Sequence, residues 1–155
     1  MFQNTIRAES NSIPSKGTKT QLLVDQSRKI LYADDDADDK AWVSEACKAI
    51  EYHLDIEFVE NGRQVLQYLE HLRPEELPSL IVLDLNMPEL DGRQTLQKIK
   101  SHQLYRDVSV VIVTTSSNKV DMEICKRLGA ELYLVKPDTH AEWQEIVKQF
   151  IPFVS

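Results

Sequence analysis

The chain has 155 residues, of which 42% are hydrophobic and 28% are charged, and its formal net charge is −7. These values are typical of one globular domain, and no apolar run approaches the roughly 20 residues of a membrane-spanning helix. An acidic chain without a cluster of lysines or arginines also lacks the surface charge that nucleic acid binding requires. Composition therefore argues against both a membrane protein and a direct nucleic acid partner.

The start of the chain differs from the rest in composition. Residues 1–26 are rich in serine, threonine, asparagine, glutamine and lysine. They bury too little apolar surface to offset the entropy of ordering, so we expect a flexible tail over 1–26 and the folded domain over 27–155. Cys47 and Cys125 are too far apart for a metal or redox motif, and no signal peptide pattern is present. These features favour a cytoplasmic protein.

After the tail, short apolar runs alternate with segments of helical periodicity. This alternation predicts strand–helix units around a parallel sheet. The predicted strands are 30–33, 56–59, 80–83, 108–113 and 132–135. Apolar residues at three- and four-residue steps predict five helices, whose buried faces are Val43/Ala46/Cys47/Ile50, Val65/Leu66/Leu69/Leu72, Leu96/Ile99, Val120/Ile124/Leu128 and Trp143/Ile146/Val147/Phe150.

Two helix ends carry recognisable signals. Asn61 precedes Gly62 as the N-cap of the second helix, and Gly129 suits a left-handed C-cap of the fourth. Strands buried on both faces and joined by right-handed crossovers form a doubly wound α/β fold. We therefore predict a five-stranded parallel sheet of the flavodoxin-like order 2-1-3-4-5 with five helices.

Polar residues follow the predicted strands at the edge where such sheets bind ligands. Asp34 and Asp35 follow the first strand, Asp84 follows the third, Thr114 ends the fourth and Lys136 follows the fifth. Converging carboxylates would repel one another unless a divalent cation lies among them, and oxygen ligands favour Mg²⁺ over zinc. A cation, a hydroxyl and an ammonium around one carboxylate suit a phosphoryl group, which makes Asp84 the predicted nucleophile.

Four of these strand ends together resemble the receiver domain of two-component response regulators. The resemblance covers residues 28 to about 151 and rests on segments 30–36, 83–92, 113–114 and 134–137. It implies that Asp84 accepts a phosphoryl group from a sensor histidine kinase or phosphotransfer protein. It also implies that Asp35 and Asp84 bind Mg²⁺ directly with the backbone carbonyl of Asn86, and that Asp34 binds it through water.

The resemblance assigns the remaining site residues to positioning and switching. Lys136 would pair with the phosphoryl oxygens, and Pro137 would follow a cis peptide that aims it. Thr114 would move toward the phosphoryl group, and Tyr133 would rotate inward as the coupled switch. Tyr133 could equally be a packed aromatic of a strand.

Several polar neighbours have simpler interpretations. We expect Asp36, Asp38 and Asp39 to stabilise the start of the first helix through its dipole and not to bind metal. Ser116 could face the water that removes the phosphoryl group, or it could be a loop cap. Asp138 stands where many receivers have an aromatic residue, and we expect it to cap the last helix.

The expected output follows from the length of the chain. The connection 72–79 is longer than the fold requires and suggests small stand-alone, chemotaxis-regulator-like receivers, some of which work with phytochrome-like kinases. Because the chain ends soon after the last helix, we expect no output domain and no turnover of external substrates. The protein would then not be an enzyme beyond its own phosphorylation and dephosphorylation. Phosphorylation would change binding to an unknown downstream protein or a homodimer contact near Trp143, Phe150 and Phe153, unless these residues are core.

Three other functions fit parts of the pattern. Alternating acids imitate a calcium-binding EF-hand loop, but Asp39 stands where that loop needs glycine and a strand precedes it. A phosphatase of the haloacid-dehalogenase type needs a second aspartate where this chain has Asn86. A receiver-like module that binds partners without phosphorylation is the remaining alternative.

Overall fold

The structure, a computed structural model, describes residues 29–155, so the predicted tail lies outside the described residues. Its five parallel strands have the order β2-β1-β3-β4-β5, which confirms the predicted flavodoxin-like topology. Each predicted strand is present within one residue of its observed ends. The strands are β1 (Lys29–Ala33), β2 (Asp55–Val59), β3 (Leu80–Leu83), β4 (Ser109–Thr114) and β5 (Leu132–Val135).

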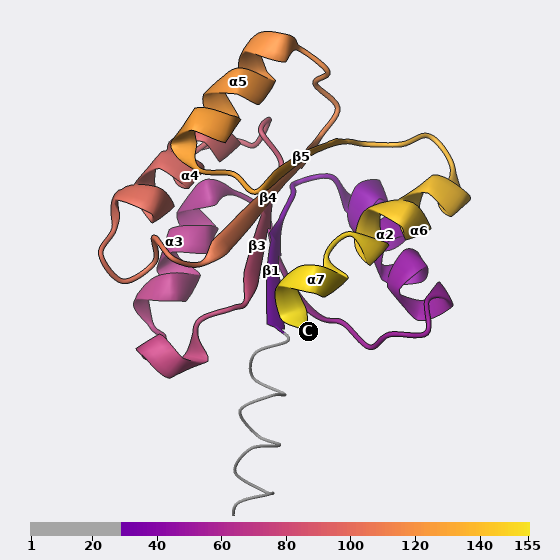
Figure 1. The fold of residues 1–155 in the computed structure, drawn as a ribbon, viewed down its shortest axis with the longest axis horizontal. Helices are drawn as coiled ribbons and strands as arrows, with labels where there is room; N and C mark the ends of the chain where they lie inside the picture. Colours follow the sequence, from indigo (N-terminus) through magenta and orange to yellow (C-terminus); the bar gives the residue numbers. More distant parts are fainter. Residues whose placement is uncertain (1–28) are drawn as a thin grey trace, which may run out of the picture.

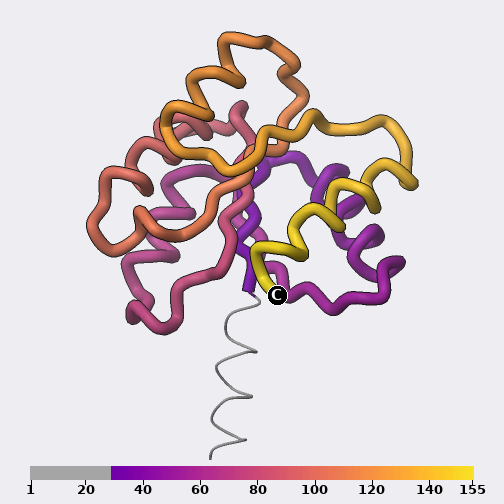
Figure 2. Tube along the Cα trace, viewed as in Figure 1, coloured from indigo at the N-terminus to yellow at the C-terminus, as the bar shows by residue number. Residues whose placement is uncertain are grey.

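Helices cover both faces of the sheet, as Figure 1 shows. One face packs against α3 (Gly62–Glu70), α4 (Gly92–Ser101) and α5 (Lys119–Leu128). The other packs against α2 (Ala37–Ala49), α6 (His140–Lys148) and the short α7 (Ile151–Val154). The trace in Figure 2 ends beside the start of β1, and Val154 belongs to the same core cluster as Ile30.

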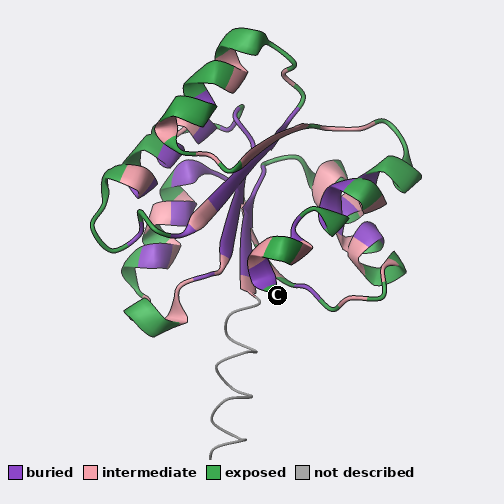
Figure 3. Cartoon of the chain, in the orientation of Figure 1, coloured by how far each residue is buried: buried purple, intermediate pink, exposed green. Residues whose placement is uncertain are grey.

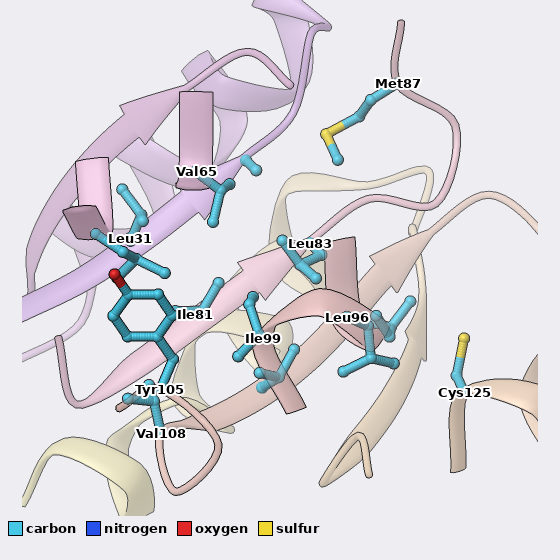
Figure 4. Packing of buried hydrophobic residues seen from close by; sticks show 14 of the residues in the cluster. Leu31, Val65, Ile81, Leu83, Met87, Leu96, Ile99, Tyr105, Val108 and Cys125 are labelled. Atoms are coloured by element: carbon cyan, nitrogen blue, oxygen red, sulfur yellow. The ribbon is translucent and has the colours of Figure 1, made fainter. Parts of the chain in front are cut away.

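The core is divided by the sheet because neighbouring strand residues point to opposite faces. Leu31, Ile81 and Leu83 pack toward α3 and α4, where they meet Leu96 and Ile99 (Figure 4). The alternate strand residues pack toward α2 and α6, and they include Tyr32, Val82 and Val113. Figure 3 shows the central strands as buried and β5 as intermediate. The residues at the ends of β1 and β3 are therefore carried on the most buried part of the backbone.

The predicted helix ends are confirmed at two positions. The Asn61 side chain accepts a hydrogen bond from the Gln64 backbone N–H at 2.9 Å, and Gly129 adopts φ 106° as the C-cap of α5. The expected cap at Asp138 is wrong, because Thr139 accepts from the backbone N–H of Glu142.

Two expected helical faces are corrected by the structure. The apolar face predicted for the last helix does not lie on one helix: α6 ends at Lys148, and Phe150 is the N-cap of α7. The break occurs because Pro152 cannot continue the helix from α6. In α5 the buried residue is Cys125, whereas Val120 and Ile124 are 64% and 37% exposed. The reason is the position of α5 beside β5, the edge strand of the sheet, which leaves part of the helix uncovered.

Candidate functional site

Two buried aspartates lie side by side at the carboxyl edge of the sheet. Asp34 directly follows β1 and Asp84 directly follows β3, its neighbour in the sheet. The backbone N–H of Asp84 donates to the carbonyl of Ala33 at 3.1 Å, and that of Asp34 donates to Val59 at 3.0 Å. Pairing thus continues past the strand ends and fixes both aspartates. Their exposed fractions are 0% and 5%.

The structure brings the predicted metal ligands together. One carboxylate oxygen each of Asp34, Asp35 and Asp84 lie within 4.8 Å of one another. Asp34 Oδ1 accepts from the backbone N–H of Asp36 at 2.9 Å, but the buried Oδ2 receives no properly directed hydrogen bond. Three carboxylates this close together form a set of oxygen ligands that fits a divalent cation.

Lys136 supplies the positive charge of the site. Its Nζ lies 2.9 Å from Asp84 Oδ2, 2.8 Å from Asp34 Oδ2 and 2.7 Å from Asp39 Oδ2. Burial alone would lower the pKa of the Lys136 ammonium, but the three carboxylates outweigh burial and raise it. Burial raises the pKa of Asp34, and the hydrogen bond from Lys136 opposes that rise. The ammonium therefore stays charged among the acids.

The expected cis peptide before Pro137 is wrong. Every peptide bond in the described residues is trans. Trans is the lower-energy isomer even before proline. The backbone of Lys136 is held by a strand-like hydrogen bond, in which its N–H donates to the Thr114 carbonyl at 2.7 Å.

The loop after β3 holds Asp84 in place from the other side. The backbone N–H of Asn86 donates to Asp84 Oδ1 at 3.3 Å, so both carboxylate oxygens of Asp84 have donors. Gly92 packs against the same backbone, since an added Cβ would lie 2.2 Å from the Asp84 carbonyl oxygen. Asp91 caps α4 and exchanges hydrogen bonds with Gln94. Close packing and capping thus fix the backbone beneath Asp84.

The loop after β4 is organised by a different set of contacts. Thr114 is fully buried, and the Tyr133 hydroxyl donates to the Ser116 carbonyl at 2.9 Å. The Ser116 hydroxyl donates to Asp121 Oδ2 at 2.7 Å, and Arg93 of α4 pairs with Asp121 Oδ1. Ser116 therefore contacts α5 through Asp121, whereas the N-cap of that helix is Asn118. Sequence reasoning missed Arg93 and Asp121 because their pairing is set by tertiary structure.

Asp39 is the other site residue that sequence reasoning missed. Asp36 is the N-cap of α2, as its expected helix-terminal role requires, and it accepts from Asp38 and Asp39 backbone N–H groups. Asp39, however, also reaches Lys136. A signal was present in the periodicity, because Asp39 lies four and seven residues before Val43 and Ala46, the buried residues of α2. An acid on a buried helical stripe calls for a partner.

The geometry also bears on the alternatives. The acidic run directly follows a strand of the central sheet, and Asp36 caps a helix, so the segment is not a helix–loop–helix calcium site. Within residues 29–155, no helix has the length and apolar character needed to cross a membrane. The geometry thus defines a doubly wound α/β domain with an acidic, lysine-containing pocket at its carboxyl edge.

Comparison with known proteins identifies the family. Residues 30–148 match the response regulator receiver domain, and the chain belongs to that family. Receiver domains act as phosphoacceptors in signalling, and they bind a divalent metal at an acidic pocket. The family prediction made from the four strand ends is confirmed.

Individual relatives and solved structures resemble this chain over most of its length. The response regulator Rcp1 of Synechocystis sp. is 32% identical over 110 residues, which cover 69% of this chain and 75% of the relative. The phosphorylated cyanobacterial phytochrome response regulator RcpA superposes with a TM-score of 0.72 at 29% identity, covering 82% of this chain and 93% of that one. The Mn²⁺-bound form of Rcp1 gives a TM-score of 0.71 at 29% identity, with 81% and 93% covered.

Proposed function

We propose that Asp84 accepts a phosphoryl group from the phosphohistidine of a sensor histidine kinase or phosphotransfer protein. The observation that carries this proposal is the position of the Lys136 ammonium, 2.9 Å from Asp84 Oδ2 in a pocket that also contains Asp34 and Asp35. In the transfer, an Asp84 oxygen forms a bond to phosphorus and the phosphorus–nitrogen bond of the donor breaks. The imidazole leaves with the electron pair and takes up a proton.

The residues of the chain have separate tasks in this reaction. Asp35, Asp84 and the backbone carbonyl of Asn86 would hold Mg²⁺ directly, and Asp34 would hold it through water. When bound, the cation neutralises charge on the phosphoryl oxygens. Lys136 exchanges its contact with the Asp84 carboxylate for contacts with the phosphoryl oxygens, and thereby stabilises the charge that Asp84 gains.

The phosphoryl group would be detected by the loop after β4. Thr114 moves its hydroxyl toward the phosphoryl oxygens, and Tyr133 then loses its hydrogen bond to Ser116 and turns inward. The elements that carry these residues are β4, β5 and the start of α5. A charge added at Asp84 thus changes the balance between two arrangements of this segment.

Binding of another protein would carry the signal onward. The exposed apolar side chains nearest to the switch are Val120 and Ile124 on α5 and Val135 on β5. Trp143 and Phe150 cannot form this contact, because they lie in the core and are only 3% and 0% exposed. The proposed binding surface for an unknown downstream protein or a homodimer is therefore formed by α5, β5 and α6. The likeness to RcpA and Rcp1 supports a phytochrome-like kinase as donor in the cytoplasm.

Acetyl phosphate provides a test that needs no cognate kinase. The chain is incubated with acetyl phosphate and Mg²⁺, and the attached phosphoryl group is measured by intact mass spectrometry. Wild type should gain one phosphoryl group, Asp84→Asn should gain none, and Asp35→Asn should gain it far more slowly because the metal is held less firmly. Equal modification of wild type and Asp84→Asn would overturn the proposal, and an unmodified wild type would favour a phosphorylation-independent interaction module.

A further inference from the structure

Asp39 makes the shortest of the three ion pairs of Lys136. Its Oδ2 lies 2.7 Å from Lys136 Nζ. We propose that Asp39 is a positioning residue, which holds the Lys136 ammonium beside Asp84 before, during and after phosphoryl transfer. The proposal deepens the proposed phosphoacceptor function and rests on it.

The position of Asp39 on α2 suits this role. Asp39 lies in the first turn, on the helical stripe that continues through the buried Val43 and Ala46, and its side chain is 21% exposed. Asp38, its neighbour in the same turn, is exposed and makes no side-chain contact with Lys136. Of these two adjacent acids, Asp39 faces Lys136 and Asp38 faces solvent.

The ammonium donates hydrogen bonds to Asp39 Oδ2 and Asp84 Oδ2 and forms an ion pair with Asp34 Oδ2. A lysine ammonium has three donor hydrogens, and three carboxylate oxygens lie around Lys136 Nζ. The backbone end of the lysine is fixed by the hydrogen bond from its N–H to the Thr114 carbonyl, and the ammonium end is fixed by these contacts. The ammonium position therefore depends on which carboxylates remain available to it.

Two of these carboxylates have other tasks during the reaction. Asp84 becomes bonded to phosphorus, and Asp34 belongs to the carboxylate cluster of the proposed metal site. Asp39 is the one contact of Lys136 among the three that is neither phosphoacceptor nor proposed metal ligand. Its ion pair can persist throughout, so that Lys136 turns from the Asp84 carboxylate to the phosphoryl oxygens without leaving the site.

A double-mutant cycle tests whether Asp39 acts through Lys136. The rate of phosphorylation by acetyl phosphate at saturating Mg²⁺ is measured for wild type, Asp39→Ala, Lys136→Ala and the double variant. We expect Asp39→Ala to lower the rate about tenfold in the wild-type background and to have no further effect once Lys136 is absent. An equal loss in both backgrounds would show that Asp39 acts independently of Lys136 and would overturn the proposal.

Asp38→Ala is the matched control, because it removes the same charge from the same helical turn. Its rate should stay within about twofold of wild type, since exposed charges are screened. If Asp38→Ala and Asp39→Ala lose equal activity, the effect is one of helix or net charge, and positioning is excluded. Thermal unfolding of both variants shows that they remain folded.

A second measurement does not depend on phosphorylation. In protein labelled with ¹⁵N-lysine, the Lys136 ammonium should give an NMR signal protected from exchange with water. Asp39→Ala should abolish this protection and Asp38→Ala should keep it; unchanged protection in Asp39→Ala would overturn the proposal. Failure of the phosphoacceptor function would instead appear as unphosphorylated wild type, with the NMR result unaffected.

Discussion

The carboxyl edge of the central strands and the side formed by α5 and β5 differ in how firmly they are held. All four residues of β3 are fully buried, and its end carries Asp84 on backbone packed against Gly92. On β5, by contrast, Val135 is 40% exposed, and on α5 Val120 is 64% exposed. Under the proposed function, the chemistry that needs fixed geometry lies on the first region, and the less buried second region is the one expected to move.

A short series of polar contacts connects the second region to the rest. Tyr133 of β5 donates to Ser116, Ser116 donates to Asp121 of α5, and Asp121 pairs with Arg93 of α4. Side-chain hydrogen bonds and a partly exposed ion pair are weaker constraints than a buried sheet. Under the proposed function, one added phosphoryl group would therefore rearrange α5 and β5 more easily than the central strands.

The largest effect is expected from Lys136→Met, which removes the only positive charge contacting Asp34 and Asp84 in the described pocket. Buried carboxylates left without their counter-charge lower the free energy of unfolding by about 3–5 kcal/mol. Mg²⁺ should restore more stability to the variant than it adds to wild type, because the cation replaces the lost charge. Urea unfolding with and without MgCl₂ measures both effects. A variant as stable as wild type in both conditions would show that the pocket is not electrostatically strained.

A pair of glycine substitutions compares the two regions directly. Gly92→Ala would place Cβ 2.7 Å from Leu85 Cα and closer still to the Asp84 carbonyl, so we expect a loss of about 1–3 kcal/mol and much slower phosphorylation. Gly129→Ala strains the positive φ at the end of α5, at a cost of about 1 kcal/mol, with phosphorylation unchanged. Denaturation and the acetyl phosphate assay measure both properties. Equal phosphorylation by both variants would contradict the difference between the regions.

The smallest effect concerns the two thiols and their pH dependence. Burial raises the pKa of Cys47 and of Cys125 to about 11, so both are neutral thiols near neutral pH. Alkylation by iodoacetamide should be slow and should rise about tenfold per pH unit up to about pH 11, because the thiolate is the nucleophile. Because burial raises the folded pKa above the unfolded value of about 8.5, the associated stability is lost as pH rises between these values.

Access distinguishes the two thiols where the pKa does not. Cys125 is fully buried on the inner face of α5, whereas Cys47 is partly exposed on α2. Peptide mass spectrometry after timed alkylation should find Cys47 modified first, with Cys125 modified at the rate at which α5 opens. Protein unfolded in urea is the control, in which both thiols should react alike. Native Cys125 reacting as quickly as in that control would mean that α5 is open already.

The sequence was sufficient for features that depend on neighbouring residues. Continuous apolar runs predicted the strands, and Asn61 and Gly129 predicted helix ends, because strand burial and capping are set within a few residues. The convergence of Asp34 with Asp84 was predictable as well, since parallel strands bring their carboxyl ends to one edge.

The remaining site contacts depend on distances that local patterns do not encode. Asp39 and Lys136 are 97 positions apart, and their pairing requires the first turn of α2 to face the end of β5. Arg93 and Asp121, 28 positions apart, meet only when α4 and α5 are packed on the same face. The exposure of Val120 was missed for a related reason, because periodicity identifies an apolar stripe but not whether the sheet is wide enough to cover it.

The most direct test of the account is hydrogen–deuterium exchange of the chain with and without acetyl phosphate and Mg²⁺. Phosphorylation should change exchange in residues 114–135, which include the last residue of β4, the loop after it, α5 and all of β5. The amides of β1 and β3 should remain protected, and Asp84→Asn should show no change anywhere. Altered exchange across the central strands, or an unchanged 114–135 segment in protein shown to be phosphorylated on Asp84, would contradict the account.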